Sequence, residues 1–416
     1  KMLWWLSVCV AFFVVSTLIL ALERAFKFVP HKGLSDLWHA THDSEHINDL
    51  SLDELHNEVM NRRRDSGFDI HPENRETIYW YNNKHVKTDV AVVFIHGWSA
   101  SPQEILAVCL KMSQNLKANL YCARLSGHGG KTEYHPQGGQ HFLNEALADK
   151  LFADAFDAAH IGEKLGNKLV FVGCSTGGAL LTYVAEHAEQ PLKSKIKALV
   201  GISPAFAMNI PCYWTLGSLF SWFRILPDCI GKIFARYLVY ALVGSKQRSM
   251  APKNDVHHIY STLCYPSEAL LTAFAVIWEC YHLDFTKIEI PTLFIGNPTD
   301  PTINWSYTCG PQVFGKLSGT KSILSVKPSS KDLYHQHVLG SHFLSPNYVE
   351  EIELAMTSFV GHHVHPHDLI QKEKEWTKAV GGNERKNIDD IINNEKNNEN
   401  RSTDQNEKKK KKKKKN

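Results

Sequence analysis

The segment at residues 173–178, Gly-Cys-Ser-Thr-Gly-Gly, constrains what this chain can fold into more than any other. It joins a short apolar run at residues 169–172 to an apolar helical stretch that begins at Ala179. Glycines two positions before and two after the serine are typical of a sharp strand-to-helix turn, where larger residues would collide. Such a turn lifts the side chain of Ser175 above the sheet, and the start of the helix favours negative charge there. Ser175 is therefore the candidate nucleophile.

The surrounding chain alternates short β-branched or aromatic runs with longer amphipathic stretches, which is typical of helices packed around a mostly parallel sheet. Its hydrophobic share of 43% excludes a largely disordered or collagen-like chain. The predicted strands cover residues 77–81, 90–95, 120–125, 169–172, 198–202, 292–295 and 322–326. The predicted helices cover residues 102–116, 144–165, 176–189 and 346–360. We therefore expect one α/β domain over residues 77–362, after an approach segment at residues 23–76 that is helical near residues 52–64.

One long interruption, at about residues 204–290, separates two of the predicted strands. An excursion of this length, placed at the carboxyl end of a strand, is expected to lie over the ligand crevice as a cap. Its aromatic residues would form the small core of the cap, line the crevice, or do both. These aromatic residues are Tyr213, Trp214, Phe220, Trp222, Phe223, Phe234, Tyr237 and Tyr240.

A nucleophilic serine also needs oxyanion donors, an acid and a base, and the chain offers each after a predicted strand. The strand at residues 90–95 runs into His-Gly-Trp, so the main-chain N–H groups of Trp98 and Thr176 are the candidate oxyanion donors. Asp300 follows the strand at residues 292–295 and is the candidate acid, ahead of Asp284 and Asp332.

The candidate base lies in the loop that follows the last predicted strand. This loop contains three histidines before the final predicted helix, namely His335, His337 and His342. The residues alone leave all three open.

At these positions the chain resembles the α/β-hydrolase family, and within it the carboxylesterases, lysophospholipases and monoacylglycerol-lipase-like serine hydrolases. The resemblance covers roughly residues 77–360. It depends on His96-Gly97, Gly127-His128-Gly129, the turn at residues 173–178, Asp300 and His337-Val-Leu. It implies that His337 is the base, because its distance from the last helix matches the family, with His342 as the main alternative and His335 after it. It also implies an α/β-hydrolase fold with about eight strands, a helical cap between the sixth and seventh, and no metal or organic cofactor.

We therefore expect a serine hydrolase that cleaves carboxylic (acyl) esters through a triad of Ser175, His337 and Asp300 and an acyl-enzyme. The expected substrate is a small-molecule acyl ester, with lipids among the candidates. The same triad would also serve a thioesterase, a peptidase or an acyltransferase, and a non-catalytic binding protein on this fold is the remaining alternative.

The N-terminal run at residues 2–22 carries no charge. As one helix it would be about 31 Å long, the thickness of a bilayer core, so we interpret it as an uncleaved transmembrane anchor. A cleaved signal peptide or a buried core helix are the alternatives. Arg24, Lys27 and Lys32 follow the run and favour a single-pass membrane protein with a cytoplasmic body.

The formal net charge of +3 belongs to the C-terminal tail. Residues 368–416 are rich in Asn, Glu and Lys and end in a lysine run at residues 408–415, a composition typical of disorder. The body before the tail is near neutral to slightly acidic and has no basic patch interleaved with aromatic residues, so a nucleic-acid partner is not expected. Nothing in the sequence determines the oligomeric state.

Overall fold

The computed structural model describes residues 44–65, 70–130, 136–210, 228–327 and 336–365. The predicted anchor at residues 2–22 and the tail at residues 368–416 lie outside this range. Within the described ranges, no helix combines the length and the apolar character needed to cross a membrane. The chain divides into two compact units, residues 1–360 and 361–416, and the central sheet belongs to the first.

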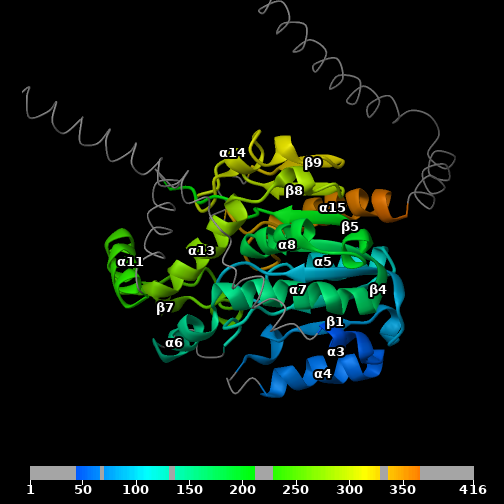
Figure 1. The fold of residues 1–416 in the computed structure, drawn as a ribbon, viewed down its shortest axis with the longest axis horizontal. Coiled ribbons are helices and arrows are strands. Elements are labelled where there is room, and N and C mark those ends of the chain that lie inside the picture. The colour runs from blue at the N-terminus through cyan, green and yellow to red at the C-terminus, as the bar shows by residue number, and fades with distance from the viewer. Residues whose placement is uncertain (1–43, 66–69, 131–135, 211–227, 328–335, 366–416) are drawn as a thin grey trace, which may run out of the picture. The chain divides into compact units, whose positions relative to one another are not determined.

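A seven-stranded sheet with the order β1-β3-β2-β4-β5-β8-β9 forms the centre of the fold (Figure 1). All neighbouring strands pair in parallel except β1, which is antiparallel to β3. The strands are β1 (Thr77–Tyr79), β2 (Thr88–Ile95), β3 (Asn119–Ala123), β4 (Gly166–Cys174), β5 (Ile196–Ile202), β8 (Thr292–Gly296) and β9 (Lys321–Ser325). Each corresponds to a strand predicted from the sequence, with bounds that differ by a few residues.

The expectation of about eight strands, which came from the family resemblance, is not met among the described residues. The described chain before β1 forms two helices, α3 (Ser44–Asp49) and α4 (Leu52–Asp65). In α4 the apolar residues Leu55 and Val59 are four positions apart and are both buried, whereas a strand needs alternation with a period of two. The helix predicted near residues 52–64 is therefore present, and α4 contacts the edge strand β1.

The central strands are buried on both faces. Every residue from Val90 to Ile95 in β2 is fully buried, and successive side chains of a strand point to opposite faces. Helices therefore cover both sides, as a parallel sheet requires. Contacts to β2 come from α5 (Leu106–Asn115), α7 (Ala148–Leu165) and α8 (Thr176–His187).

The long interruption after β5 contains helices and a small two-stranded antiparallel sheet. Its described elements are α11 (Asp228–Val243), β6 (Gln247–Ser249), α12 (His257–Tyr260), β7 (Cys264–Pro266) and α13 (Leu270–Tyr281). β7 packs against α6 (Pro136–Glu145), and α13 packs against α7 and α8. The remaining short helices are α9 (Leu192–Lys195) and α14 (Trp305–Thr308), and α15 (Val349–Val364) is the last described helix. Residues 211–227, with several of the aromatic residues expected in a cap, lie outside the described ranges.

The interruption reaches the loop that follows β2. The N–H of Thr262 donates to the carbonyl of Ser99 at 2.7 Å, and the indole N–H of Trp98 donates to the hydroxyl of Tyr265 at 3.3 Å. Its described part is therefore in contact with the candidate oxyanion loop, although a cap over a crevice stays a prediction.

Candidate active site

Ser175 lies in a strained turn between β4 and α8. Its backbone has φ 50° and ψ −116°, a conformation that non-glycine residues rarely adopt and that is concentrated at functional sites. Its N–H donates to the carbonyl of Ile202 in β5 at 2.8 Å, which holds the turn against the neighbouring strand. The sharp turn predicted from the glycine pattern is therefore present.

The two glycines that flank Ser175 are required by close backbone contacts. A Cβ atom at Gly173 would lie 2.4 Å from the backbone nitrogen of Gly178. A Cβ atom at Gly177 would lie 2.1 Å from the carbonyl oxygen of Ile95. Neither position leaves room for a larger residue, so the glycines let α8 start directly beside the end of β2.

His337 joins Ser175 to Asp300 through two hydrogen bonds. Its Nδ1 atom lies 2.7 Å from Asp300 Oδ2, and its Nε2 atom lies 2.9 Å from Ser175 Oγ. An ionised carboxylate only accepts, so Nδ1 donates and Nε2 is left to accept the serine hydroxyl. All three side chains are buried, with exposed fractions of 7% for Ser175, 8% for His337 and 2% for Asp300. The structure thus brings together the three residues chosen from the sequence.

The carboxyl group of Asp300 is held by its own loop. Its Oδ1 atom accepts the N–H groups of Thr302 at 2.7 Å and Ile303 at 3.0 Å, which leaves Oδ2 for His337. The fully buried Asn297 donates from Nδ2 to the carbonyl of Gln336 at 3.0 Å, so it ties the loop of the acid to the loop of the base. The sequence did not lead us to predict a role for Asn297. Its one signal there is that a polar side chain directly follows a buried strand.

The two alternatives that the structure describes, His342 and Asp284, make other contacts. His342 is exposed and packs against the rings of Tyr260 and Phe343, with centroid distances of 6.4 and 5.2 Å. Asp284 accepts the N–H of Thr286 at the start of a 3₁₀ helix, Phe285–Lys287. His335 and Asp332 lie outside the described residues.

The candidate oxyanion donors are both free. Within the described ranges, neither the backbone N–H of Trp98 nor that of Thr176 donates a hydrogen bond to a protein acceptor. The loop that carries Trp98 approaches the nucleophile closely, because a Cβ atom at Gly97 would lie 3.1 Å from Ser175 Cβ. Thr176 is the first residue of α8, where an N–H has no intrahelical acceptor.

His96 connects the oxyanion loop to the loop after β3. Its Nδ1 atom donates to the carbonyl of Gly97 at 2.9 Å, and its Nε2 atom accepts the N–H of Leu125 at 3.1 Å. The ring is fully buried, and burial together with the nearby His128 lowers its pKa well below the usual range. His96 is therefore a neutral structural link.

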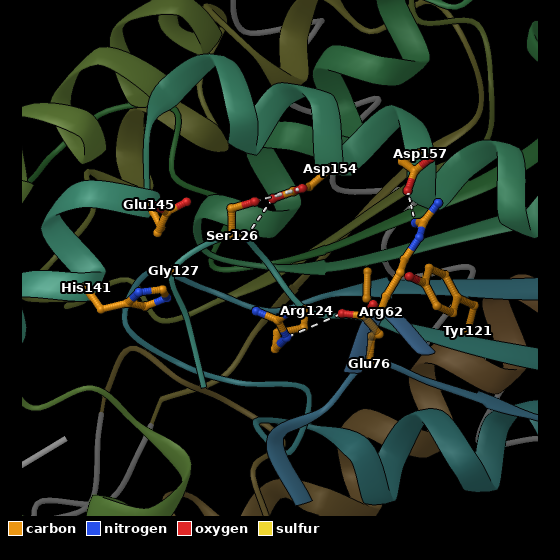
Figure 2. Close-up of a pocket in the computed structure, with 11 residues that line it drawn as sticks. Arg62, Glu76, Tyr121, Arg124, Ser126, Gly127, His141, Glu145, Asp154 and Asp157 are labelled. Atoms are coloured by element: carbon orange, nitrogen blue, oxygen red, sulfur yellow. Dashed lines mark hydrogen bonds and ion pairs between the residues drawn. The ribbon is translucent and has the colours of Figure 1, made fainter. Parts of the chain in front are cut away.

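A polar cavity of about 510 Å³ lies beside the loop after β3 (Figure 2). It is lined by Arg62, Glu76, Tyr121, Ala123, Arg124, Ser126, Gly127, His141, Glu145, Asp154 and Asp157. Several of its charged groups neutralise one another. Arg62 pairs with Asp157, and Arg124 Nε lies 3.3 Å from Glu76 Oε2. The first pair joins α4 to α7, and the second joins the residue before β1 to the residue after β3, so these charges hold neighbouring segments together.

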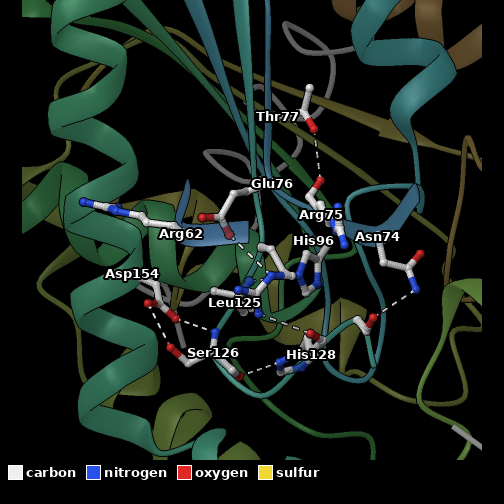
Figure 3. A network of polar contacts seen from close by, with 12 residues as sticks. Arg62, Asn74, Arg75, Glu76, Thr77, His96, Leu125, Ser126, His128 and Asp154 are labelled. Carbon is white, nitrogen blue, oxygen red and sulfur yellow. Dashed lines mark hydrogen bonds and ion pairs between the residues drawn. The ribbon is translucent and has the colours of Figure 1, made fainter. Parts of the chain in front are cut away.

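The wall of this cavity continues to His96 (Figure 3). Asp154 accepts the N–H of Ser126 at 2.6 Å and its hydroxyl at 3.0 Å, and burial raises the pKa of Asp154 to about 7. His128 donates from Nδ1 to the carbonyl of Ser126 at 2.9 Å, and the neighbouring Leu125 N–H reaches His96. Polar contacts therefore connect α7 to the oxyanion loop.

No three His, Cys, Asp or Glu side chains within the described ranges are grouped so that they could hold a metal ion.

Comparison with known proteins identifies the family of the chain. The sequence profile described as the alpha/beta hydrolase family matches residues 92–323, which is more than half of the chain. The chain therefore belongs to the α/β-hydrolase family, and the protein is a hydrolase of that family. A search of curated proteins finds no match.

Similar solved structures include those of lipolytic enzymes. A structure from a study of two metagenome-derived lipolytic enzymes has 18% identity and a TM-score of 0.48, covering 71% of this chain and 100% of its own. The monoacylglycerol lipase of Paleococcus ferrophilus has 15% identity and a TM-score of 0.46, covering 69% and 98%. A soluble variant of monoglyceride lipase from Saccharomyces cerevisiae has 12% identity and a TM-score of 0.42, covering 70% and 91%. These similarities are too distant to indicate a substrate.

Proposed function

We infer that this protein is a serine hydrolase that cleaves carboxylic (acyl) esters through an acyl-enzyme. The observation that supports this most directly is the hydrogen-bond path from Asp300 through His337 to the hydroxyl of Ser175. A nucleophile, a base and an orienting acid in register are what acyl transfer needs, whereas a binding protein has no use for them.

In the acylation half, Ser175 Oγ attacks the carbonyl carbon of the ester while its proton moves to His337 Nε2. The carbonyl oxygen becomes an oxyanion, for which the N–H groups of Trp98 and Thr176 are the free donors. The tetrahedral intermediate collapses, the bond to the alcohol oxygen breaks, and the alcohol leaves with the proton from His337.

In the deacylation half, water takes the place of the alcohol. His337 Nε2 removes a proton from the water as the water oxygen bonds to the acyl carbon. The bond to Ser175 Oγ then breaks, the serine regains its proton from His337, and the carboxylic acid leaves. Asp300 remains ionised throughout and stabilises the positive charge on the imidazole.

A fluorophosphonate probe tests the role of Ser175. The probe should label the wild-type protein and should not label Ser175→Ala, and the same substitution should lower kcat for an acyl ester by several orders of magnitude. Thermal unfolding of both proteins provides the control that the variant is folded. Equal labelling of Ser175→Ala, or no labelling of well-folded wild-type protein, would contradict the proposal.

A substrate panel separates ester hydrolysis from the other reactions that this triad supports. Esters, thioesters and peptides of the same acyl group are compared, and each is offered water or an alcohol as acceptor. We expect esters with water to give the highest kcat/KM. A preference for thioesters, for peptides or for transfer to the alcohol would contradict ester hydrolysis as the reaction but would still agree with Ser175 as the nucleophile.

We further propose that the substrate is a lipid acyl ester and that residues 2–22 anchor the protein in a membrane with a cytoplasmic body. The support is the uncharged N-terminal run, the length of that run and the positive charges that follow it. Medium-chain and long-chain acyl esters should then react faster than acetyl esters. Equal or lower rates for the longer chains would overturn the lipid assignment.

A further inference from the structure

One buried carboxyl group next to the candidate site has no role in the mechanism above. Glu104 lies in the turn before α5, and its side chain is only 3% exposed. Its N–H donates to the carbonyl of Ser101 at 3.0 Å, so the turn directs the residue back toward the start of the loop after β2. A glutamate is rarely buried without partners, because removing a carboxyl group from water is costly.

The partners of Glu104 belong to two different loops. Its Oε2 atom accepts the N–H of Gly97 at 2.7 Å, in the loop that carries Trp98. The thiol of Cys174, the residue before Ser175, lies close enough to the same carboxyl group for each to shift the pKa of the other. Glu104 thus connects the oxyanion loop to the nucleophile turn.

Gly97 is packed tightly between Glu104 and the Cys174–Ser175 turn. A Cβ atom built on Gly97 would lie 3.1 Å from Ser175 Cβ, 3.2 Å from Glu104 Oε1 and 3.4 Å from the carbonyl oxygen of Cys174. The peptide before Trp98 is therefore in contact with both the carboxyl group and the turn. Gly97 uses its N–H on Glu104, whereas the next N–H along the chain, that of Trp98, has no acceptor among the described residues.

We propose that Glu104 is a positioning residue that holds the Gly97–Trp98 peptide against the Cys174–Ser175 turn and so sets where the Trp98 N–H stands relative to Ser175 Oγ. This inference rests on the function proposed above, in which that N–H stabilises the oxyanion. An oxyanion donor acts mainly in the transition state, so its displacement lowers kcat more than it changes KM. Burial also raises the pKa of Glu104, which agrees with a carboxyl group removed from water.

Two substitutions separate the hydrogen bond from the charge. Glu104→Ala removes the acceptor for Gly97, and we expect kcat to fall about 100-fold with KM changed no more than about threefold. Glu104→Gln keeps a carbonyl oxygen that can accept the same N–H, so kcat should stay within about tenfold of the wild type.

Glu163→Ala is the matched control. Glu163 is another buried glutamate, 8% exposed at the end of α7, and it is paired with Lys195 away from the triad. We expect its loss to lower the thermal midpoint while kcat remains at the wild-type value. A purely destabilising substitution is thereby separated from one that moves an oxyanion donor.

Amide hydrogen exchange tests the hydrogen bond between Gly97 and Glu104 without any substrate. The N–H of Gly97 should exchange at least about tenfold faster in Glu104→Ala than in the wild type, and close to the wild-type rate in Glu104→Gln. Unchanged exchange in Glu104→Ala, or wild-type kcat in that variant, would overturn the positioning role. A Glu104→Gln protein as slow as Glu104→Ala but with normal Gly97 exchange would also overturn it, because the charge would then matter instead. If the wild type neither reacts with a fluorophosphonate nor cleaves esters, the proposed function fails. The exchange measurement still tests whether Glu104 holds the Gly97 N–H.

Discussion

Three side chains from three separate loops meet at one edge of the sheet. Ser175 follows β4, Asp300 follows β8, and His337 lies in the segment after β9. These strands run in parallel, so their carboxyl ends share an edge. The contact of 2.7 Å between His337 and Asp300 leaves Nε2 without a proton and directed at the serine.

Asp300→Asn should preserve the fold and change the tautomer of the His337 imidazole. The amide can donate to His337 Nδ1, which would move the ring proton to Nε2 and prevent that atom from accepting the serine proton. We expect kcat for an acyl ester to fall by about 10⁴-fold with little change in KM. Steady-state kinetics beside a thermal unfolding curve checks this, and a loss of less than tenfold would contradict the role of Asp300.

His128 makes the stability of the fold depend on pH in the acid range. The ring is fully buried, and burial lowers its pKa from 6.5 to about 4. In the folded protein it therefore stays neutral, while in the unfolded chain it binds a proton below pH 6.5. Between pH 6.5 and 4 the unfolded state binds more protons, so stability falls as pH falls, by roughly 3 kcal/mol from this residue.

His128→Asn should remove this part of the pH dependence. The amide can still donate to the carbonyl of Ser126, so the loop keeps its hydrogen bond. The free energy of unfolding of both proteins is measured in urea at several pH values from 7 to 4. We expect the wild type to lose stability relative to the variant as pH falls, and a difference that is constant with pH would show the prediction to be wrong.

At the scale of the elements, the position of α8 depends on glycines. α8 begins at Thr176, directly after Ser175, and its first turn lies against the end of β2 at Ile95. Helix and strand can approach so closely only because Gly177 has no side chain. The same closeness places the N-terminus of α8, the positive end of the helix dipole, beside Ser175.

Gly177→Ala should disturb both stability and reactivity. Its Cβ would lie 2.1 Å from a backbone oxygen, so strand or helix must move, at a cost of about 3 kcal/mol. We expect slower fluorophosphonate labelling and a lower midpoint in urea. Gly315→Ala is the control, because its Cβ would make only an ordinary contact of 3.5 Å. Equal behaviour of the two variants would contradict the steric argument.

At the scale of the whole molecule, the charge and the apolar run belong to different parts of the chain. The lysine-rich tail and the uncharged N-terminal run both lie outside the described residues, whereas Ser175, Asp300 and His337 are all described and lie more than 150 positions after residue 22. Membrane attachment and catalysis should therefore be separable.

Removal of residues 2–22 tests that separation. If they anchor the protein, the shortened chain should move from the membrane fraction to the supernatant, because the hydrophobic attachment is lost. Its kcat/KM for a water-soluble ester should remain within about threefold of the full chain, since no triad residue is affected. A shortened chain that stays with the membrane would contradict the anchor, and carbonate extraction of the full chain provides the control.

The sequence predicted features that depend on neighbours along the chain. The seven strands followed from local periodicity, and Ser175 followed from the glycines around it, because the turn is a local steric requirement. Asp300 followed from its place after a strand. The choice of His337 over His342 came from the family resemblance, since all three loop histidines look alike in sequence.

The tertiary structure decided everything that depends on contacts between distant segments. It placed His337 on Ser175 and left His342 exposed, because only the folded loop determines which ring reaches the serine. It gave a sheet of seven strands among the described residues where the family resemblance implies about eight, and it showed Asn297 tying the loop of Asp300 to the loop of His337. The Glu104 contacts to Gly97 and Cys174 could not be read from spacing, because a buried polar side chain acquires its partner only when separate segments pack. Local sterics determined the turn that carries Ser175, and long-range packing determined which side chains surround it.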